Sequence, residues 1–117
     1  MIRVRFKDGR VYNLYVADNF FKRALGLMFR NIGKNEGMIF FYKRRKLHIH
    51  TFFMRFPIDV IFLEDKEVVE VVRNLKPWRT YRSKVYSNAM IEIRSDDTLE
   101  VEVGDRVEFI GSKNLRE

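Results

Sequence analysis

The residues from His50 to Glu64, HTFFMRFPIDVIFLE, constrain the fold of this chain more than any other segment. They form a dense apolar run that is interrupted once, by Pro57, and that holds Asp59 among large apolar side chains. Proline lacks the N–H that a central strand donates, so we expect one strand over 47–56 and another over 58–64. Because burying a carboxylate without partners is costly, Asp59 requires a specific role in the interior.

The N-terminal residues predict a β-hairpin. Apolar and polar side chains alternate over 2–6 and again over 10–16, and the Asp8-Gly9 pair between the two runs is a strong turn signal. Further apolar or alternating runs predict strands at 38–42, 68–75, 89–94, 99–103 and 107–110, separated by turns or loops at 43–46, 64–67 and 76–78.

One short helix is predicted after the hairpin. Asp18 favours an N-cap, and apolar residues at 21, 24, 25 and 28 share one side of a helix. Roughly eight short strands and this helix predict a single domain over 1–117: a mainly β, small closed or nearly closed antiparallel β-barrel-like domain with one short α-helix. The alternative is a sheet of about five or six strands packed by the helix. Closure is favoured because several runs are apolar on both faces.

The composition predicts a basic, soluble protein with a thermophile-like bias. Lys and Arg number 23 against 16 Asp and Glu, and the net charge is +7. Charged residues make up 33% of the chain, and Cys and Gln are absent, which is typical of hyperthermophile proteins. The absence of cysteine excludes disulfides and cysteine-based zinc sites.

The first residues lack the apolar core of a signal peptide, and no apolar run approaches the ~18 residues of a membrane span, so we expect a cytoplasmic location.

Four short motifs follow one another along the chain. They are Gly26-Leu27-Met28, Gly37-Met38-Ile39-Phe40, Pro57-Ile58-Asp59-Val60-Ile61-Phe62 and Gly104-Asp105-Arg106-Val107. Their order resembles an uncharacterised protein family, domain of unknown function 192 (also uncharacterised protein family 0127). The resemblance covers nearly the whole chain and is strongest over 18–109. It implies a compact, mainly β domain and no established activity, substrate or cofactor.

The chain departs from many bacterial members of that family just before Pro57. Those relatives carry Trp-Met-Lys-Asn-Thr at the positions that here read His50-Thr51-Phe52-Phe53-Met54. A ligand site built by the Trp, Lys and Asn side chains of those relatives therefore does not carry over to this sequence.

The preferred function is a non-enzymatic β domain that binds a small ligand or a partner. Its candidate ligand-binding residues are His50, Thr51, Arg55 and Asp59, which are polar groups that converge within an apolar segment. Asp59 could orient a ligand or act as a base with a raised pKa. The structural alternative is a carboxylate that accepts backbone N–H bonds, or that pairs with Arg55 or another arginine.

Two basic clusters with aromatic neighbours suggest an alternative function, single-stranded nucleic-acid binding. The first cluster is Lys43-Arg44-Arg45-Lys46, and the second contains Trp78, Arg79 and Arg82. Cations can clamp phosphates while an aromatic ring stacks on a base, and small barrels bind single strands in this way. The competing interpretation is two solvated loops, with Trp78 covering a barrel end.

A metal-assisted hydrolase is the second alternative. On a strand, His48 and His50 would point to one face and could share a metal, with Asp59 or a glutamate as third ligand. The apolar residues that continue this face, Phe52 among them, argue against an open metal site. We identify no nucleophile with an activating base and no glycine-rich phosphate loop, so we predict no catalytic residues and no cofactor. The balance leans away from an enzyme.

Overall fold

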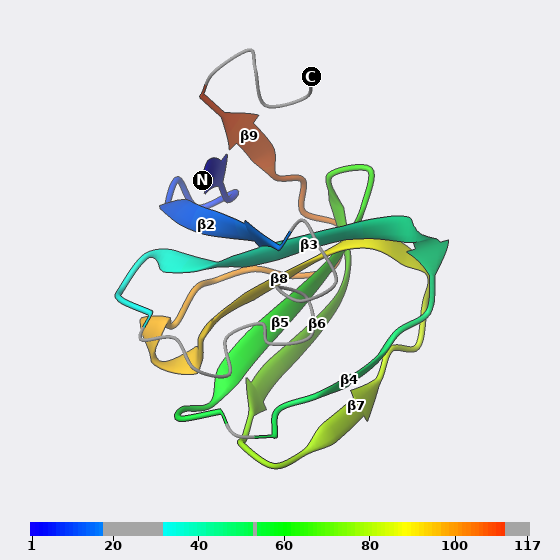
Figure 1. Ribbon diagram of the computed structural model, residues 1–117. Helices are drawn as coiled ribbons and strands as arrows, with labels where there is room; N and C mark the ends of the chain where they lie inside the picture. The colour runs from blue at the N-terminus through cyan, green and yellow to red at the C-terminus, as the bar shows by residue number, and fades with distance from the viewer. Residues whose placement is uncertain (18–31, 53, 112–117) are drawn as a thin grey trace.

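The computed structural model describes residues 1–17, 32–52 and 54–111, and it confirms a mainly β domain (Figure 1). The helix predicted after Asp18 lies outside the described residues. The elements are β1 (Ile2–Arg5), β2 (Val11–Ala17), β3 (Glu36–Arg45), β4 (His48–His50), β5 (Ile58–Glu64), β6 (Glu67–Leu75), β7 (Thr80–Arg82), β8 (Ser87–Arg94), the short 3-10 helix η1 (Ser95–Asp97) and β9 (Glu108–Ile110).

The strands form one large curled sheet and one small ribbon. The 7-stranded sheet has the order β6-β5-β8-β3-β2-β1-β9, and β4 pairs with β7 in a separate two-stranded ribbon. Neighbouring strands run antiparallel, including the predicted hairpin β1–β2, except that β2 and β3 are parallel. A parallel pair needs a crossover of about a dozen residues or more, and the chain between Ala17 and Glu36 supplies that length.

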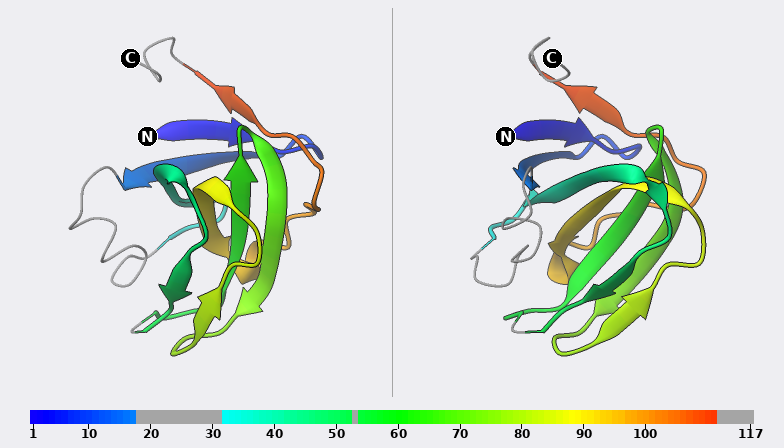
Figure 2. Two further views of the ribbon diagram at one scale, coloured as in Figure 1. Left: turned by 90° about the vertical axis from the view of Figure 1, so that its right-hand side faces the viewer. Right: turned by 45° about the vertical axis from the view of Figure 1, so that its right-hand side comes forward.

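The sheet curls into a half-barrel whose two edges meet through a short segment (Figure 2). The segment 104–107, just before β9, lies against the start of β6. The Val68 N–H donates to the Asp105 carbonyl (2.8 Å), and the Gly104 N–H donates to the Val68 carbonyl (2.9 Å). A third bond joins the Val107 N–H to the Lys66 carbonyl (2.9 Å). The barrel is therefore nearly closed, by these bonds and not by a continuous ladder from β6 to β9.

Both faces of the central strands are buried. Along β5, Ile61 and Leu63 belong to one apolar cluster, whereas Val60 and Phe62 belong to a second cluster on the opposite face. The first cluster fills the inside of the curl. The β4–β7 ribbon covers part of the second cluster, where the ring of Tyr81 stacks 6.4 Å from that of Phe62.

One loop prediction and one strand prediction are corrected by the strand boundaries. The sequence pattern predicts a turn or loop at Lys43–Lys46, but β3 extends to Arg45, with a bulge between Phe41 and Arg45 where it pairs with β8. The pattern predicts one strand over 47–56, but within this run only β4 is a strand. The buried Thr51 bonds to the chain at Lys76 and Arg79, and this pairing turns the backbone out of the extended path.

The strand predicted over 99–103 is also corrected, because the structure has no strand there. Leu99 and Val101 are buried as the alternation indicated, and Val103 is exposed. The Arg73 guanidinium donates to the carbonyl oxygens of Leu99 (2.6 Å) and Val101 (2.7 Å). These bonds use backbone acceptors that a neighbouring strand would otherwise occupy.

Candidate functional site

The β4–β7 ribbon is the part of the molecule that gathers most of the residues singled out in the sequence. It forms a sheet separate from the seven-stranded one and spans the lower right of Figure 1. His48 pairs with Arg82, Ile49 with Tyr81, and His50 with Thr80. The pairing continues beyond the strands, because the Ser83 N–H donates to the Leu47 carbonyl (2.8 Å) and the Thr51 N–H to the Arg79 carbonyl (2.8 Å).

Strand alternation divides the ribbon into an inner and an outer face. Ile49 and Tyr81 point inward and pack on the second apolar cluster. The alternate residues are all exposed to solvent. We call them the outer face of the ribbon: Lys46, His48, His50, Phe52, Trp78, Thr80, Arg82 and Lys84.

Three aromatic rings form a stack at one end of the outer face. The rings of His50 and Phe52 are 4.7 Å apart between centroids, and those of Phe52 and Trp78 are 5.8 Å apart. The Phe52 N–H also donates to Nδ1 of His50 (3.2 Å). Trp78 is 55% exposed although it is the largest aromatic side chain. The stacked rings therefore give this end of the outer face an exposed aromatic surface.

The buried side chain of Thr51 fixes the two loops that carry this aromatic stack. It is 1% exposed, and its Oγ1 donates to the Lys76 carbonyl (2.6 Å) while accepting from the Arg79 N–H (2.9 Å). Its carbonyl accepts from the Trp78 N–H (3.0 Å), and Trp78 has a left-handed backbone with φ of 65°. One buried hydroxyl therefore ties together the two loops that carry Phe52 and Trp78.

The outer face itself carries positive charge and no acid, and the nearby acids Glu64 and Glu67 line a surface hollow with Lys46 and Lys84. Neither 46–52 nor 76–84 contains an aspartate or glutamate. Within the described part of the chain, the side chains of Lys46, Arg82 and Lys84 form no ion pair. The Lys46 ammonium lies 5.4 Å from the centroid of the Tyr86 ring, which extends the basic-aromatic surface toward β8.

The acid beneath the ribbon, Glu70, is buried and already bonded. It accepts from the Tyr81 hydroxyl and from the backbone N–H groups of Lys84 (2.8 Å) and Val85 (3.2 Å). Burial, and then the bond to this carboxylate, raises the pKa of Tyr81 to about 12. The phenol therefore stays protonated and keeps donating to Glu70, which fixes the ribbon on the body of the domain.

The remaining predicted nucleic-acid residues lie around the ribbon and not on its outer face. Arg79 is exposed in the loop before β7, and Lys43 and Arg45 are exposed at the end of β3. Arg44 forms an ion pair with Glu64 and lies 4.7 Å from the centroid of the Tyr86 ring. The structure therefore joins Lys46 of the first predicted cluster to Trp78 and Arg82 of the second.

Asp59 lies on the opposite side of the sheet from the ribbon and is engaged within the protein. It is 2% exposed, and Oδ1 accepts from the Asn74 N–H (2.8 Å). Oδ2 accepts from the Arg73 guanidinium (3.3 Å), the same group that holds the Leu99 and Val101 carbonyls. These bonds match the structural alternative for Asp59, with Arg73 as the arginine that sequence reasoning did not identify.

The four candidate ligand-binding residues consequently do not share one site. His50 and Thr51 belong to the ribbon, Arg55 is exposed in the segment that follows it, and Asp59 faces Arg73 and Asn74. His48 and His50 do share the outer face as predicted. Among the described residues, no three of His, Asp or Glu are placed to hold a metal ion.

Comparisons with known proteins agree with this architecture. The model of the DUF192 family, described as uncharacterized ACR, matches residues 3–109. A UPF0127 protein of Pyrococcus abyssi is 46% identical over 81% of this chain and 84% of its own length, and one of Pyrococcus furiosus is 45% identical over 80% and 83%.

Two solved structures share the fold. One is described as a proposed transcription regulator from Sinorhizobium meliloti 1021, with a TM-score of 0.81 and 25% identity over 92% of both chains. The other is a protein of unknown function from Novosphingobium aromaticivorans, with a TM-score of 0.78 and 26% identity over 92% of this chain and 82% of its own. Within the described residues, no helix is long and apolar enough to cross a membrane. The chain belongs to the uncharacterised DUF192 family, whose relatives named above include proteins of thermophilic archaea.

Proposed function

We propose that this protein is a non-enzymatic binding domain and that its ligand is single-stranded nucleic acid, held across the outer face of the ribbon. The observation that carries the proposal is the combination of an exposed aromatic stack with three cations that lack ion-pair partners within the described chain, on one acid-free face. Bases stack on aromatic rings with little dependence on sequence, and lysine and arginine neutralise the phosphates between them.

The geometry favours a single strand over a duplex. The outer face is a slightly twisted ribbon with its rings exposed on the surface, and such rings can stack only on bases that are not already stacked in a helix. The Sinorhizobium meliloti structure, described as a proposed transcription regulator, supports nucleic-acid binding in general and does not distinguish single strands from duplexes. Because single-stranded nucleic acid is found mainly inside cells, we also propose the cytoplasmic location that the sequence predicts.

Salt dependence of oligonucleotide binding tests the proposal directly. With a fluorescein-labelled oligothymidylate, and about three phosphates neutralised, log K should fall with log salt at a slope of about −2. Affinity should therefore drop roughly fifteenfold between about 50 and 200 mM salt. No binding at low salt would contradict the proposal.

Matched variants locate the interaction on the ribbon. Trp78→Ala should weaken binding by roughly tenfold or more, as expected when one stacked base is lost. Arg82→Ala should reduce the salt slope by about 0.7. The control is Arg3→Ala, which removes an exposed arginine from β1, on the sheet and not on the ribbon. Equal effects of Arg82→Ala and Arg3→Ala would show attraction by net charge alone and would overturn the assignment of the ribbon.

A further inference from the structure

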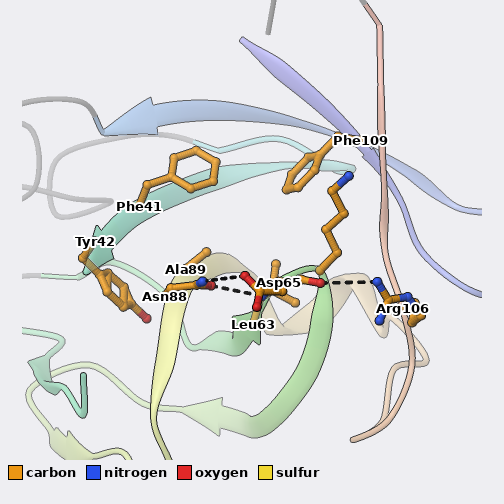
Figure 3. Close-up of a pocket in the computed structure, with 9 residues that line it drawn as sticks. Phe41, Tyr42, Leu63, Asp65, Asn88, Ala89, Arg106 and Phe109 are labelled. Atoms are coloured by element: carbon orange, nitrogen blue, oxygen red, sulfur yellow. Dashed lines mark hydrogen bonds between the residues drawn. The ribbon is translucent and has the colours of Figure 1, made fainter. Parts of the chain in front are cut away.

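A pocket at the open end of the half-barrel is separate from the ribbon. It encloses about 480 Å³, within the range of small-molecule sites. Figure 3 shows its lining, which comes from β3, β5, the β5–β6 turn, β8, and β9 with the residues before it. Its lining includes Phe41, Leu63, Lys66, Ala89, Arg106 and Phe109.

The walls of this pocket are apolar and aromatic. Phe41 and Phe109 form one wall, with ring centroids 6.3 Å apart and ring planes inclined at 52°. Leu63 and Ala89, which belong to the first apolar cluster, form the floor. The tilted pair of rings and the apolar floor together leave a space suited to a planar ring, which would bury its faces against carbon atoms.

The rim of the pocket carries an excess of positive charge. Lys66 forms no ion pair with a described residue, and its ammonium lies 5.7 Å from the centroid of the Phe109 ring. Arg106 contacts the Asp65 carbonyl (3.4 Å) and is 4.0 Å from Glu67, both at the limit of such contacts. The rim acid, Asp65, is already bonded to the Asn88 amide (3.0 Å).

The turn that presents Lys66 adopts a backbone that lysine rarely takes. Asp65 has φ of 50° and Lys66 has φ of 73°, so both central residues of this two-residue hairpin are left-handed. Such turns favour glycine at the second position. A lysine there is unfavourable for the turn, and its ammonium group lies beside the Phe109 ring at the pocket.

We infer that this pocket binds a small aromatic carboxylate. The ring lies between the Phe41–Phe109 wall and the Leu63–Ala89 floor, and the carboxylate meets the Lys66 ammonium and the Arg106 guanidinium at the rim. A charge-assisted contact of this kind distinguishes the anion from neutral or cationic molecules with the same ring. The inference does not depend on the proposed binding of nucleic acid.

Three probe compounds separate the parts of this inference. Indole-3-acetate carries the ring and the anion, tryptamine carries the ring with a cation, and cyclohexaneacetate carries the anion without the aromatic ring. Binding is followed by two-dimensional NMR of the intact chain, using the backbone amides of Lys66, Asn88 and Phe109. We expect indole-3-acetate to shift these amides in a saturable way, and each of the other two to bind at least tenfold more weakly. Equal binding of tryptamine, or shifts confined to residues outside the pocket, would overturn the inference.

Two variants at one position separate binding from folding. Lys66→Met removes the charge and should weaken indole-3-acetate binding roughly tenfold. Lys66→Gly removes the charge and also relieves the left-handed backbone, so it should weaken binding equally while raising the melting temperature. Lys34→Met, an exposed lysine outside the pocket, is the control and should leave binding unchanged. Unchanged binding in both Lys66 variants would overturn the role of the rim charge.

Discussion

Glu92 is a carboxyl group buried on the sheet face that carries the second apolar cluster. It lies in β8 opposite Met38 and Val60, and it is 7% exposed. Desolvation by burial raises the pKa of Glu92 from 4.5 to about 7. The folded state therefore holds a proton on this group at pH values where the unfolded chain has already released it, and stability falls as pH rises through that window.

Glu92→Gln should remove this pH dependence. Near pH 4.5 the variant and the parent should be about equally stable, because both side chains are then neutral. The advantage of the variant should grow between pH 4.5 and 7 and level off near about 3 kcal/mol, the free energy of a shift of this size. Urea unfolding of both proteins at pH 4.5, 6 and 8 measures this difference in the free energy of unfolding. A difference that does not change with pH would contradict the assignment.

Asp59 is buried and pairs with the partly exposed Arg73, and the sequence alone identified only the acid of this pair. Arg73 bonds to Asp59, to Leu99 and to Val101, so its removal leaves a buried carboxylate and two carbonyls without those donors. Arg73→Met should destabilise the fold by about 2–4 kcal/mol. Asp59→Asn, which keeps an acceptor for the Asn74 N–H, should cost about half as much.

Urea unfolding measures both variants against Arg3→Met as an exposed control, which should change stability by less than about 0.5 kcal/mol. If Arg73→Met is no worse than this control, the three-way contact of Arg73 does not stabilise the fold. The sequence pattern placed Asp59 in the interior correctly. The pattern could not show which arginine forms the ion pair with Asp59, because Arg73 contacts it from the neighbouring strand across a register shift.

At the scale of elements, the ribbon depends on one buried hydroxyl. Thr51→Val keeps the shape of the side chain but removes the bonds to Lys76 and Arg79. We expect a loss of about 1–3 kcal/mol and a less fixed position for Trp78. Because the chain contains one Trp, its fluorescence reports this change directly, as a red-shifted emission together with weaker oligonucleotide binding.

Thr80→Val is the matched control for this prediction. Thr80 lies on the outer face of the same ribbon, is exposed, and pairs with His50 through the backbone only. It should therefore leave both stability and Trp emission nearly unchanged. Emission that is identical in Thr51→Val and the parent would show that the aromatic stack is held by other contacts.

Local sequence patterns identified most strands, and they failed where contacts with distant parts of the chain determine the backbone conformation. Alternation or apolar runs located β1, β2, β5, β6 and β8 to within a few residues. The run at Leu99 and Val101 has the same alternation, but the guanidinium of Arg73 takes its carbonyls, and no pattern within 99–103 records that. Likewise, Lys46, Trp78 and Arg82 share one face only because β4 pairs with β7, which is a fact of the whole fold.

At the scale of the whole molecule, Gly104 lies where the two edges of the curled sheet meet. It has φ of 99°, and its N–H bonds to the Val68 carbonyl across the gap. Gly9, in the β1–β2 turn, has φ of 95°. A Cβ at either glycine would meet nothing within 4 Å, so alanine strains the backbone at both without a clash. We expect Gly104→Ala and Gly9→Ala each to cost about 1–2 kcal/mol.

The two substitutions should nevertheless open different parts of the molecule. Gly104→Ala weakens the bonds that join β6 to the segment before β9, so hydrogen exchange should accelerate at the amides of Val68 and Val107. Gly9→Ala strains only a hairpin turn, so faster exchange should be confined to β1 and β2. Acceleration at Val68 and Val107 in both variants, or in neither, would mean that closure does not depend on this contact. Exchange localised by Gly104→Ala would instead show that three bonds hold a half-barrel nearly shut without a continuous strand ladder.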